Sequence, residues 1–222
     1  MDPDLEELLL ATHYSYMHLS CVHYGLAELA AKSAVTLLRY SDVVPTDKLY
    51  YQAGMACKTL SSEQNLAFLL LSRYIDLSDA IGDGSDAMLE NSAFQECDNI
   101  PADFQLPQTQ YVADEVRVPR PLLFRQRESQ FLGMYVCWWL HGQSTREGVR
   151  DWVLEMCTSS DIEQQLPSAA DARGTLYEGL YTSDRPSCIV TGFPVHAVDM
   201  LHANGSVANK RDWNAYVGKT KR

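Results

Sequence analysis

The sequence has 222 residues, 46% of them hydrophobic, and a formal net charge of −11. This hydrophobic fraction predicts a buried core, and the length allows one large domain or two small ones. The negative charge argues against broad binding to nucleic acids or membrane surfaces. Because the chain starts with acidic residues and its longest apolar runs are too short to cross a bilayer as helices, we expect a soluble intracellular protein.

The cysteines are distributed singly along the chain, within or beside apolar stretches. The six are Cys21, Cys57, Cys97, Cys137, Cys157 and Cys188. None forms a C-x-x-C pair, and this pattern is typical of reduced, buried thiols rather than of a disulfide framework or a zinc site.

Residues 1–80 predict a series of helices. The first, which Asp4 can cap, carries an apolar face at a spacing of three to four residues, made of Leu5, Leu8, Leu9, Thr12, Tyr16 and Leu19. A second helix is expected from about residue 25 to residue 40. Thr46 is the expected N-cap of a third helix, and Ser61 or Ser62 begins a fourth that runs through Tyr74.

Corresponding helices recur after about 40 residues, which is typical of stacked helical hairpins of the tetratricopeptide kind. Small residues occur where paired helices must approach closely: Gly54, Ala56 and Ala67. Two hairpins are fewer than the roughly three repeats that such arrays need, so the segment resembles the end of a longer solenoid. A small four-helix bundle is the alternative on the same pattern.

Residues 81–121 predict an acidic linker. No Lys or Arg occurs between Arg73 and Arg117, and the prolines and the lack of periodicity favour an extended chain. The stretch "DGSDAMLE" does not fit a calcium-binding loop, because an apolar residue falls on a ligand position. Residues 122–167 predict a helical connector. Ser144 or Thr145 can cap its clearest helix, whose apolar face is Val149, Trp152, Val153 and Met156.

No catalytic signature is present in the sequence. It contains no G-x-S-x-G, H-E-x-x-H or G-x-x-x-x-G-K-[ST] motif, which argues against a hydrolase, kinase or oxidoreductase, and no motif indicates a cofactor. His13, His18 and His23 are spaced by five residues in a predicted helix, which spreads them around the helix instead of placing them on one face. We therefore expect them to be core or solvated histidines.

Residues 168–222 predict a small α+β domain, so the expected fold class is mainly α with a small α+β domain at the end. Residues 188–191 suit a short β-strand followed by a turn at Gly-Phe-Pro, and residues 195–201 suit a second strand. The Asn204-Gly205 pair is a hairpin signal.

Asn209 is the expected N-cap of a closing helix that carries Trp213, Tyr216 and Val217 on one side. A zinc site would need four ligands, usually in close Cys and His pairs. This region offers only three, at unpaired spacings: Cys188, His196 and His202. We therefore expect hydrogen bonds and packing, rather than a metal, to hold this module.

Two stretches of the module, "CIVTGFPV" and "NGSVANKRDWNAYV", resemble the U-box, the zinc-free relative of the RING domain. In this resemblance Cys188 matches the Cys that opens the first loop, and Val190 matches the Ile of that loop. Gly205 matches the turn glycine, and Trp213 and Tyr216 match apolar positions of the helix. Ile189 stands where U-boxes have proline, and "HAVDML" lacks the proline of the second loop.

A longer resemblance is carried by "VRDWVLEMCTSSDIEQQLP", "ARGTLYEGLY", "CIVTGFPV" and "VANKRDWNAYV", in that order. These stretches resemble the C-terminal part of the family of the largest subunit of intraflagellar transport complex B. The resemblance is strong over residues 149–217, and over residues 1–80 it rests on the helix pairs. It implies a tetratricopeptide solenoid that ends in a U-box-like domain. It also implies a place in the cilium or flagellum and basal body, on the cytoplasmic side, with partners in complex B and possible contacts to complex A.

The U-box resemblance implies that the module engages the ubiquitin system. Such modules hold a ubiquitin-conjugating enzyme and promote transfer of ubiquitin without covalent catalysis, so E3 ligase activity is a hypothesis and no residue is expected to be catalytic. The implied partner-binding residues are Pro186, Cys188, Ile189, Val190, Phe193, Pro194, Trp213 and Tyr216. Phe193 and Pro194 are expected at an exposed loop tip, whereas Trp213 is more simply a core residue of so small a domain.

The alternative hypothesis is a non-catalytic docking platform for other intraflagellar transport subunits. The two missing prolines favour it, as do the helical repeats, which characteristically bind partners. Cys188 could also be considered as a nucleophile activated by Arg185 and His196. Buried packing is the simpler interpretation of a lone cysteine among apolar residues.

Overall fold

A computed structural model describes residues 3–41, 43–83, 146–158, 167–168, 170–181, 183–203 and 205–220. Within these ranges the chain is mainly helical, with a two-stranded sheet followed by a C-terminal helix, as the sequence predicted. Most of the predicted acidic linker over residues 81–121 and the first part of the predicted connector over residues 122–167 lie outside the described residues.

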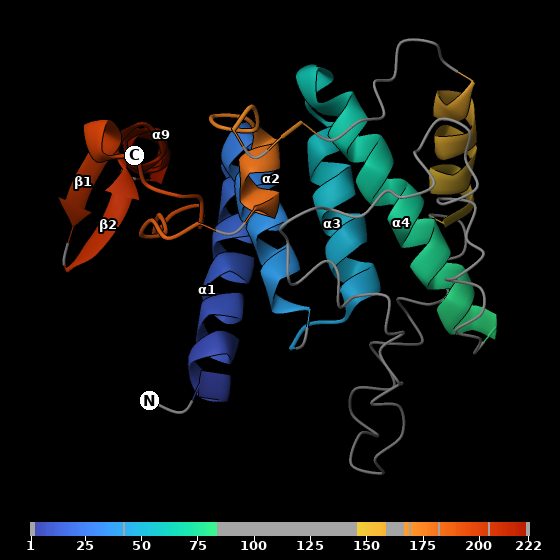
Figure 1. Cartoon of the computed structure of the whole chain (residues 1–222), viewed down its shortest axis with the longest axis horizontal. Helices are drawn as coiled ribbons and strands as arrows, with labels where there is room; N and C mark the ends of the chain where they lie inside the picture. The colour runs from blue at the N-terminus through green and yellow to red at the C-terminus, as the bar shows by residue number, and fades with distance from the viewer. Residues whose placement is uncertain are drawn as a thin grey trace.

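The first part of the chain forms four α-helices in a row. They are α1 (Pro3–His23), α2 (Ala27–Leu37), α3 (Thr46–Lys58) and α4 (Gln64–Asp83), with 3-10 turns η1 (Leu38–Tyr40) and η2 (Ser61–Glu63) before α3 and α4. Each helix contacts the next one in the chain, and Figure 1 shows them side by side in sequence order. The helices predicted from periodicity are thus confirmed.

The contact between α3 and α4 depends on a glycine. A Cβ atom at Gly54 would lie 2.6 Å from Cδ2 of Leu71, which is inside van der Waals contact. Ala67 on α4 is fully buried. These small residues let the two helices approach closely, as expected, and the close packing continues through one core cluster that spans α1 to α4.

The buried face of α1 differs from the predicted apolar face. The predicted face is exposed at Leu5 (58%), Leu8 (50%), Leu9 (58%), Tyr16 (65%) and Leu19 (63%). The face that packs instead carries Ala11, Tyr14, Met17, His18 and Cys21. Small and polar side chains on this face allow α1 to pack closely against α2. A pattern of large apolar side chains does not reveal such a face.

Two of the predicted N-caps are also wrong. α1 begins at Pro3, so Asp4 lies inside the helix. Thr46 is the first residue of α3 and is buried, while Pro45 takes the N-cap position without a side-chain hydrogen bond. Proline fits this position because its fixed φ suits the start of a helix and it has no N–H group to satisfy.

A further helix over residues 146–157 packs against α4. Its Trp152, Val153 and Met156 lie against Phe68 and Leu69, so the predicted apolar face is confirmed. The ammonium group of Lys58 is 4.4 Å from the centroid of the Trp152 ring, within the range of a cation–π contact. None of the described helices is long and apolar enough to span a membrane.

The last part of the chain returns to the other end of the row. The 3-10 helix η4 (Leu176–Leu180) contacts α2, and Leu176 and Leu180 are buried in the main core. The hairpin of β1 (Met200–Ala203) and β2 (Ser206–Asn209) follows, and α9 (Lys210–Thr220) closes the chain. Figure 1 shows this terminal module beside α1.

The strand assignments of the module were only partly correct. The hairpin turn lies where Asn204-Gly205 predicted it, between antiparallel β1 and β2. Residues 188–191, however, form no strand: an isolated bridge joins Ser187 and Pro194, which lie on either side of them. The reason is the reversal at Gly192, whose φ of 76° is the left-handed conformation that glycine adopts readily.

Candidate interaction surface of the terminal module

The predicted contact loop is a tight, closed turn. We call residues 188–195 the first loop. The Cys188 N–H group donates to the Phe193 carbonyl at 2.8 Å, and the Gly192 N–H group donates to the Cys188 carbonyl at 2.7 Å. The Val195 N–H group donates to the Pro186 carbonyl at 2.9 Å and so closes the base of the loop. The loop therefore has a fixed shape that side chains from other elements can recognise.

Helix α1 holds the start of the first loop. Nε2 of His13 donates to the carbonyl of Ile189 at 2.7 Å, and the Tyr14 hydroxyl donates to the carbonyl of Cys188 at 3.3 Å. Burial raises the pKa of the Tyr14 hydroxyl well above its usual range, so this group stays a neutral donor at physiological pH. Both contacts join residues far apart in the sequence.

Helix α2 and the 3-10 turn η1 that follows it hold the tip of the first loop. The Thr36 hydroxyl donates to the Thr191 carbonyl at 2.6 Å, and the Arg39 guanidinium donates to the Gly192 carbonyl at 3.3 Å. Arg39 also donates to the carbonyl of Gly179 in η4 at 3.2 Å. Main-chain oxygens of the loop tip are therefore satisfied by side chains of the helical part rather than by solvent.

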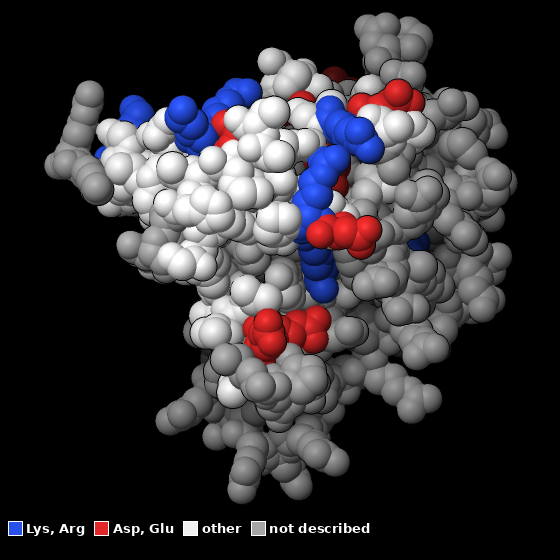
Figure 2. All heavy atoms as spheres, turned by 60° about the vertical axis from the view of Figure 1, so that its left-hand side comes forward, with Lys and Arg blue, Asp and Glu red and all other residues white. Residues whose placement is uncertain are grey.

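A buried charge fastens α9 to α2. The Asp212 carboxylate, only 2% exposed, accepts from Lys32 at 2.9 Å and from the Thr191 hydroxyl at 3.0 Å. A more exposed ion pair joins Arg211 to Glu28 at 3.0 Å. Figure 2 shows acidic and basic side chains interspersed on this face, beside a broad area of uncharged residues. The described residues on the face shown in Figure 2 form no single-sign patch of the kind that favours an anionic polymer or membrane.

A second core cluster joins the module to α1 and α2. Its buried members are Met17, Cys21, Leu29, Ala30, Cys188, Val190, Val195 and Ala208. Cys188 is 0% exposed, and its sulfur accepts from the Asn209 N–H group at 3.3 Å. Full burial of Cys188 and the backbone N–H group bound to its sulfur favour the core interpretation of this residue over the nucleophile.

The exposure expected for the loop tip is wrong. Phe193 is 4% exposed, and Pro194 is buried as well. The Phe193 ring fills the space between α2 and η4, where a Cβ atom on Gly179 would meet it at 2.7 Å. The Lys32 ammonium lies 5.9 Å from the ring centroid. The apolar tip therefore packs within this chain, because α2 and η4 supply the surface that covers it.

Four of the remaining predicted residues are at least partly accessible. Pro186 is exposed, and Ile189, Trp213 and Tyr216 are half-buried against the second cluster. Trp213 thus contributes to the core, as expected, and still presents part of its ring. Val190 is buried, in agreement with a core role. Val198, which the sequence analysis did not single out, is 99% exposed in the 3-10 turn η5 (Ala197–Asp199).

The polar residues that hold the loop were not found from the sequence. Lys32, Thr36 and Arg39 recur at a spacing of three to four residues, which places them on one face of an otherwise apolar helix. That spacing is the signal that could have identified them. No comparable sequence pattern identifies Asp212 as a contact residue, because a single acidic residue in the first turn of a helix is common.

His196 takes part in an ion cluster rather than in a metal site. Its Nδ1 accepts from Arg185 at 2.8 Å, and its Nε2 donates to the Glu178 carboxylate at 3.1 Å. Glu178 also accepts from the Gly174 N–H group at 2.9 Å. Among the described residues, no group of three His, Cys, Asp or Glu side chains could hold a metal ion. Arg185 and His196 are thus engaged with η4 and not with the Cys188 thiol.

Asn209 has a different role from the one predicted. It immediately precedes α9, but its Nδ2 donates to the Pro194 carbonyl at 3.3 Å, and its Oδ1 has no hydrogen-bond partner among the described residues. The side chain therefore ties β2 to the first loop and does not cap the helix.

Curated relatives match nearly all of this chain, although no protein-family model matches it. It is 31% identical over 98% of its length to the intraflagellar transport protein 172 homolog of Danio rerio, and 32% identical over 94% to intraflagellar transport protein 172 of Chlamydomonas reinhardtii. Intraflagellar transport protein osm-1 of Caenorhabditis elegans is 30% identical over 86%. The chain spans 9 to 11% of the length of these relatives. The family resemblance noted in the sequence is thereby confirmed.

Proposed function

Because this chain is homologous over nearly its whole length to a segment of the intraflagellar transport protein 172 family, we propose that it works in intraflagellar transport. In this proposal it is the C-terminal part of a train subunit that serves cilium assembly at the cilium or flagellum and its basal body, on the cytoplasmic side. Its partners are other subunits of complex B and, through them, complex A. Residues 1–80 act as tetratricopeptide-like repeats, and residues 168–222 act as a U-box-like module.

The module's proposed role is to engage a ubiquitin-conjugating enzyme or ubiquitin. The observation that carries this proposal is the arrangement of a closed loop, a two-stranded hairpin and a helix around one small apolar cluster. The cluster is held by contacts such as the Asn209 N–H bond to the Cys188 sulfur. This arrangement supports the U-box resemblance without any need for zinc ligands.

The proposed contact area is smaller than the one expected from the sequence. It consists of Pro186 with the accessible parts of Ile189, Trp213 and Tyr216. Such a surface acts by holding the conjugating enzyme, and no ionised catalytic side chain is required. Ligase activity in this proposal is weak, because burial of Phe193 and its neighbour removes the loop tip from the contact area.

The second candidate is a docking platform with no role in ubiquitin transfer. The observation that favours it is the anchoring of the first loop on α1, α2 and η1 by His13, Tyr14, Thr36 and Arg39. A module fixed in this way extends the helical surface instead of moving as a separate domain. Other transport subunits would then bind the combined surface of helices and module.

Ubiquitin transfer by the 222-residue chain distinguishes these candidates. The purified chain is incubated with activating enzyme, ubiquitin and a panel of conjugating enzymes. The test variant is Ile189→Ala, on the proposed contact area. The matched control is Leu154→Ala, which removes a 58% exposed apolar side chain from the helix over residues 146–157. Ubiquitin ladders that Ile189→Ala abolishes and Leu154→Ala preserves support the first candidate. A folded chain that is inactive across the panel, and binds neither ubiquitin nor a conjugating enzyme, overturns it in favour of the platform.

A further inference from the structure

Helix α1 is hydrogen-bonded to two of the four residues that make up the proposed contact area. Nε2 of His13 donates to the Ile189 carbonyl at 2.7 Å. The Ser20 and Tyr216 hydroxyls share a hydrogen bond, with 3.0 Å between their oxygens. His13 and Ser20 lie within about 20° of each other around α1, because each residue of an α-helix adds about 100°. One side of α1 therefore borders the contact area, and Figure 1 shows this helix beside the module.

Next to this side, α1 exposes two large apolar side chains. Leu9 is 58% exposed and Tyr16 is 65% exposed. Leu9 is one turn from His13, and Tyr16 is one turn from both His13 and Ser20, so these residues are neighbours on the helix surface, with Cβ atoms about 5–6 Å apart. Around the helix, Leu9 and Tyr16 lie about 40° and about 60° from His13. The exposed apolar surface of α1 is therefore continuous with the contact area.

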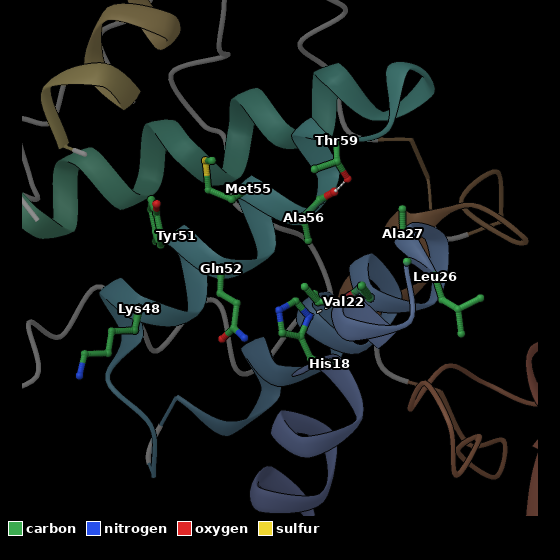
Figure 3. A pocket seen from close by; sticks show the side chains of 12 residues that line it. His18, Val22, Leu26, Ala27, Lys48, Tyr51, Gln52, Met55, Ala56 and Thr59 are labelled. Carbon is green, nitrogen blue, oxygen red and sulfur yellow. Dashed lines mark hydrogen bonds between the residues drawn. The ribbon is translucent and has the colours of Figure 1, made fainter. Parts of the chain in front are cut away.

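The opposite side of α1 borders a cavity that α3 lines from across it. Val22 is one of the lining residues, as Figure 3 shows. Around the helix, Val22 lies about 180° from His13, and Leu8 lies about 140° from it. Val22 is 56% exposed and Leu8 is 50% exposed, but both lie away from the contact area. They are therefore a matched comparison for Leu9 and Tyr16 on the same helix.

The contact area on the module is too small to hold a protein partner by itself. It consists of one exposed and three half-buried residues, namely Pro186, Ile189, Trp213 and Tyr216. A standard interface buries about 800 Å² on each partner, from roughly 20–30 residues, and a round patch of that area is about 30 Å across. Leu9 and Tyr16 are only about 11 Å apart along the axis of α1. A protein of ordinary size that is seated on the contact area therefore also reaches these two side chains.

We propose that the surface that holds a ubiquitin-conjugating enzyme extends from the module onto α1, where Leu9 and Tyr16 contact the enzyme. This inference rests on the proposed function, in which the module engages the ubiquitin system. Tyrosine combines an apolar ring with a hydroxyl and is enriched among the residues that dominate binding energy. Because Leu9 and Tyr16 carry no charge, the surface of the enzyme that fits here is apolar. The helical part then contributes to recognition of the enzyme as well as to support of the first loop.

Binding of conjugating enzymes to the 222-residue chain tests this extension. The probes are the purified enzymes of the panel described above, each without ubiquitin, and calorimetry gives the Kd of those that bind. The test variant is Leu9→Ala/Tyr16→Ala. The matched control is Leu8→Ala/Val22→Ala, which removes two apolar side chains of similar exposure from the same helix. We expect the Kd to rise at least about tenfold in the test variant and less than about twofold in the control.

Circular dichroism checks the fold of both variants, which is expected to be intact because the replaced side chains are exposed. An enzyme that loses affinity for Ile189→Ala but binds Leu9→Ala/Tyr16→Ala as tightly as the parent chain overturns this inference and leaves the proposed function standing. Equal weakening by the two α1 variants also overturns it, as does a loss seen only with free ubiquitin as the probe. A parent chain that binds no enzyme of the panel overturns the proposed function together with the inference.

Discussion

Thr36 and Gly192 are in direct contact where α2 meets the first loop, and the contact leaves no space for a side chain on Gly192. A Cβ atom at that position would lie 2.1 Å from Cγ2 of Thr36, and the glycine has a φ of 76°. The Thr36 hydroxyl also donates to the neighbouring Thr191 carbonyl at 2.6 Å. The terminal module and the helical part are therefore coupled through the backbone of the loop.

Gly192→Ala tests this coupling. The new methyl group adds a steric clash to the strain of the left-handed conformation, so we expect a loss of at least about 3 kcal/mol in the free energy of unfolding. Gly205→Ala is the matched control, since Gly205 has a φ of 82° but no atom within 4 Å of its Cβ position. The control should lose only about 1–2 kcal/mol. Urea unfolding followed by tryptophan fluorescence measures both values, and equal losses would show that the Thr36 contact is unimportant.

Lys32→Ala is expected to weaken the attachment of α9 to α2. It leaves the Asp212 carboxylate buried without its cation, which costs about 3 kcal/mol of stability. Arg211→Ala removes an exposed ion pair with Glu28 and should cost less than about 1 kcal/mol, decreasing further in high salt. Thermal unfolding of the two variants at low and high salt makes the comparison. A similar small loss for both would mean that Asp212 finds other partners or solvent.

The helices were predictable because local patterns determine them. Apolar spacing located α2, α3 and α4, and the small side chain of Gly54 indicated the close approach of α3 to α4. The buried face of α1 was not predictable in this way. Its exposed Leu5 and Leu9 are larger and more apolar than Ala11 on the packed side, so hydrophobicity alone points to the wrong face.

The hairpin turn of the candidate site could be predicted from the sequence, but the burial of its loop side chains could not. The Asn-Gly hairpin signal is local, and it placed the turn between β1 and β2 correctly. Whether Phe193 is exposed depends on Gly179 and α2, which approach it only in the folded chain. The β-branched character of residues 188–191 favoured a strand, but the reversal at Gly192 and the hydrogen bonds from α1 and α2 determine the backbone there.

The protonation of His18 should make stability depend on pH. Burial disfavours the charged ring, so the folded-state pKa lies below the unfolded value of about 6.5. The unfolded state therefore binds more protons below pH 6.5, and the contribution to stability is complete above that pH and lost as the pH falls. By pH 5.5 the loss from this group reaches up to about 1.4 kcal/mol.

His18→Asn isolates this effect, because asparagine can still donate to the Ala30 carbonyl but does not titrate. We expect urea unfolding to show a smaller loss of stability for this variant than for the parent chain between pH 7.5 and pH 5.5. Other titrating groups, including Asp47, contribute to both proteins and are removed by the subtraction. Identical losses in the two proteins would contradict a buried neutral His18.

Substitutions of Cys188 separate its packing role from a chemical one. Cys188→Ser keeps an acceptor near the Asn209 N–H group, so we expect a folded module with a loss of about 1–2 kcal/mol and any ubiquitin transfer retained. Cys188→Arg places a long cation in a site with 0% exposure and should unfold the module, at a cost above about 4 kcal/mol. Circular dichroism and urea unfolding report on the fold, and the transfer assay reports on activity. A correctly folded Cys188→Ser protein that has lost transfer would identify the thiol as a chemical participant and refute the packing interpretation.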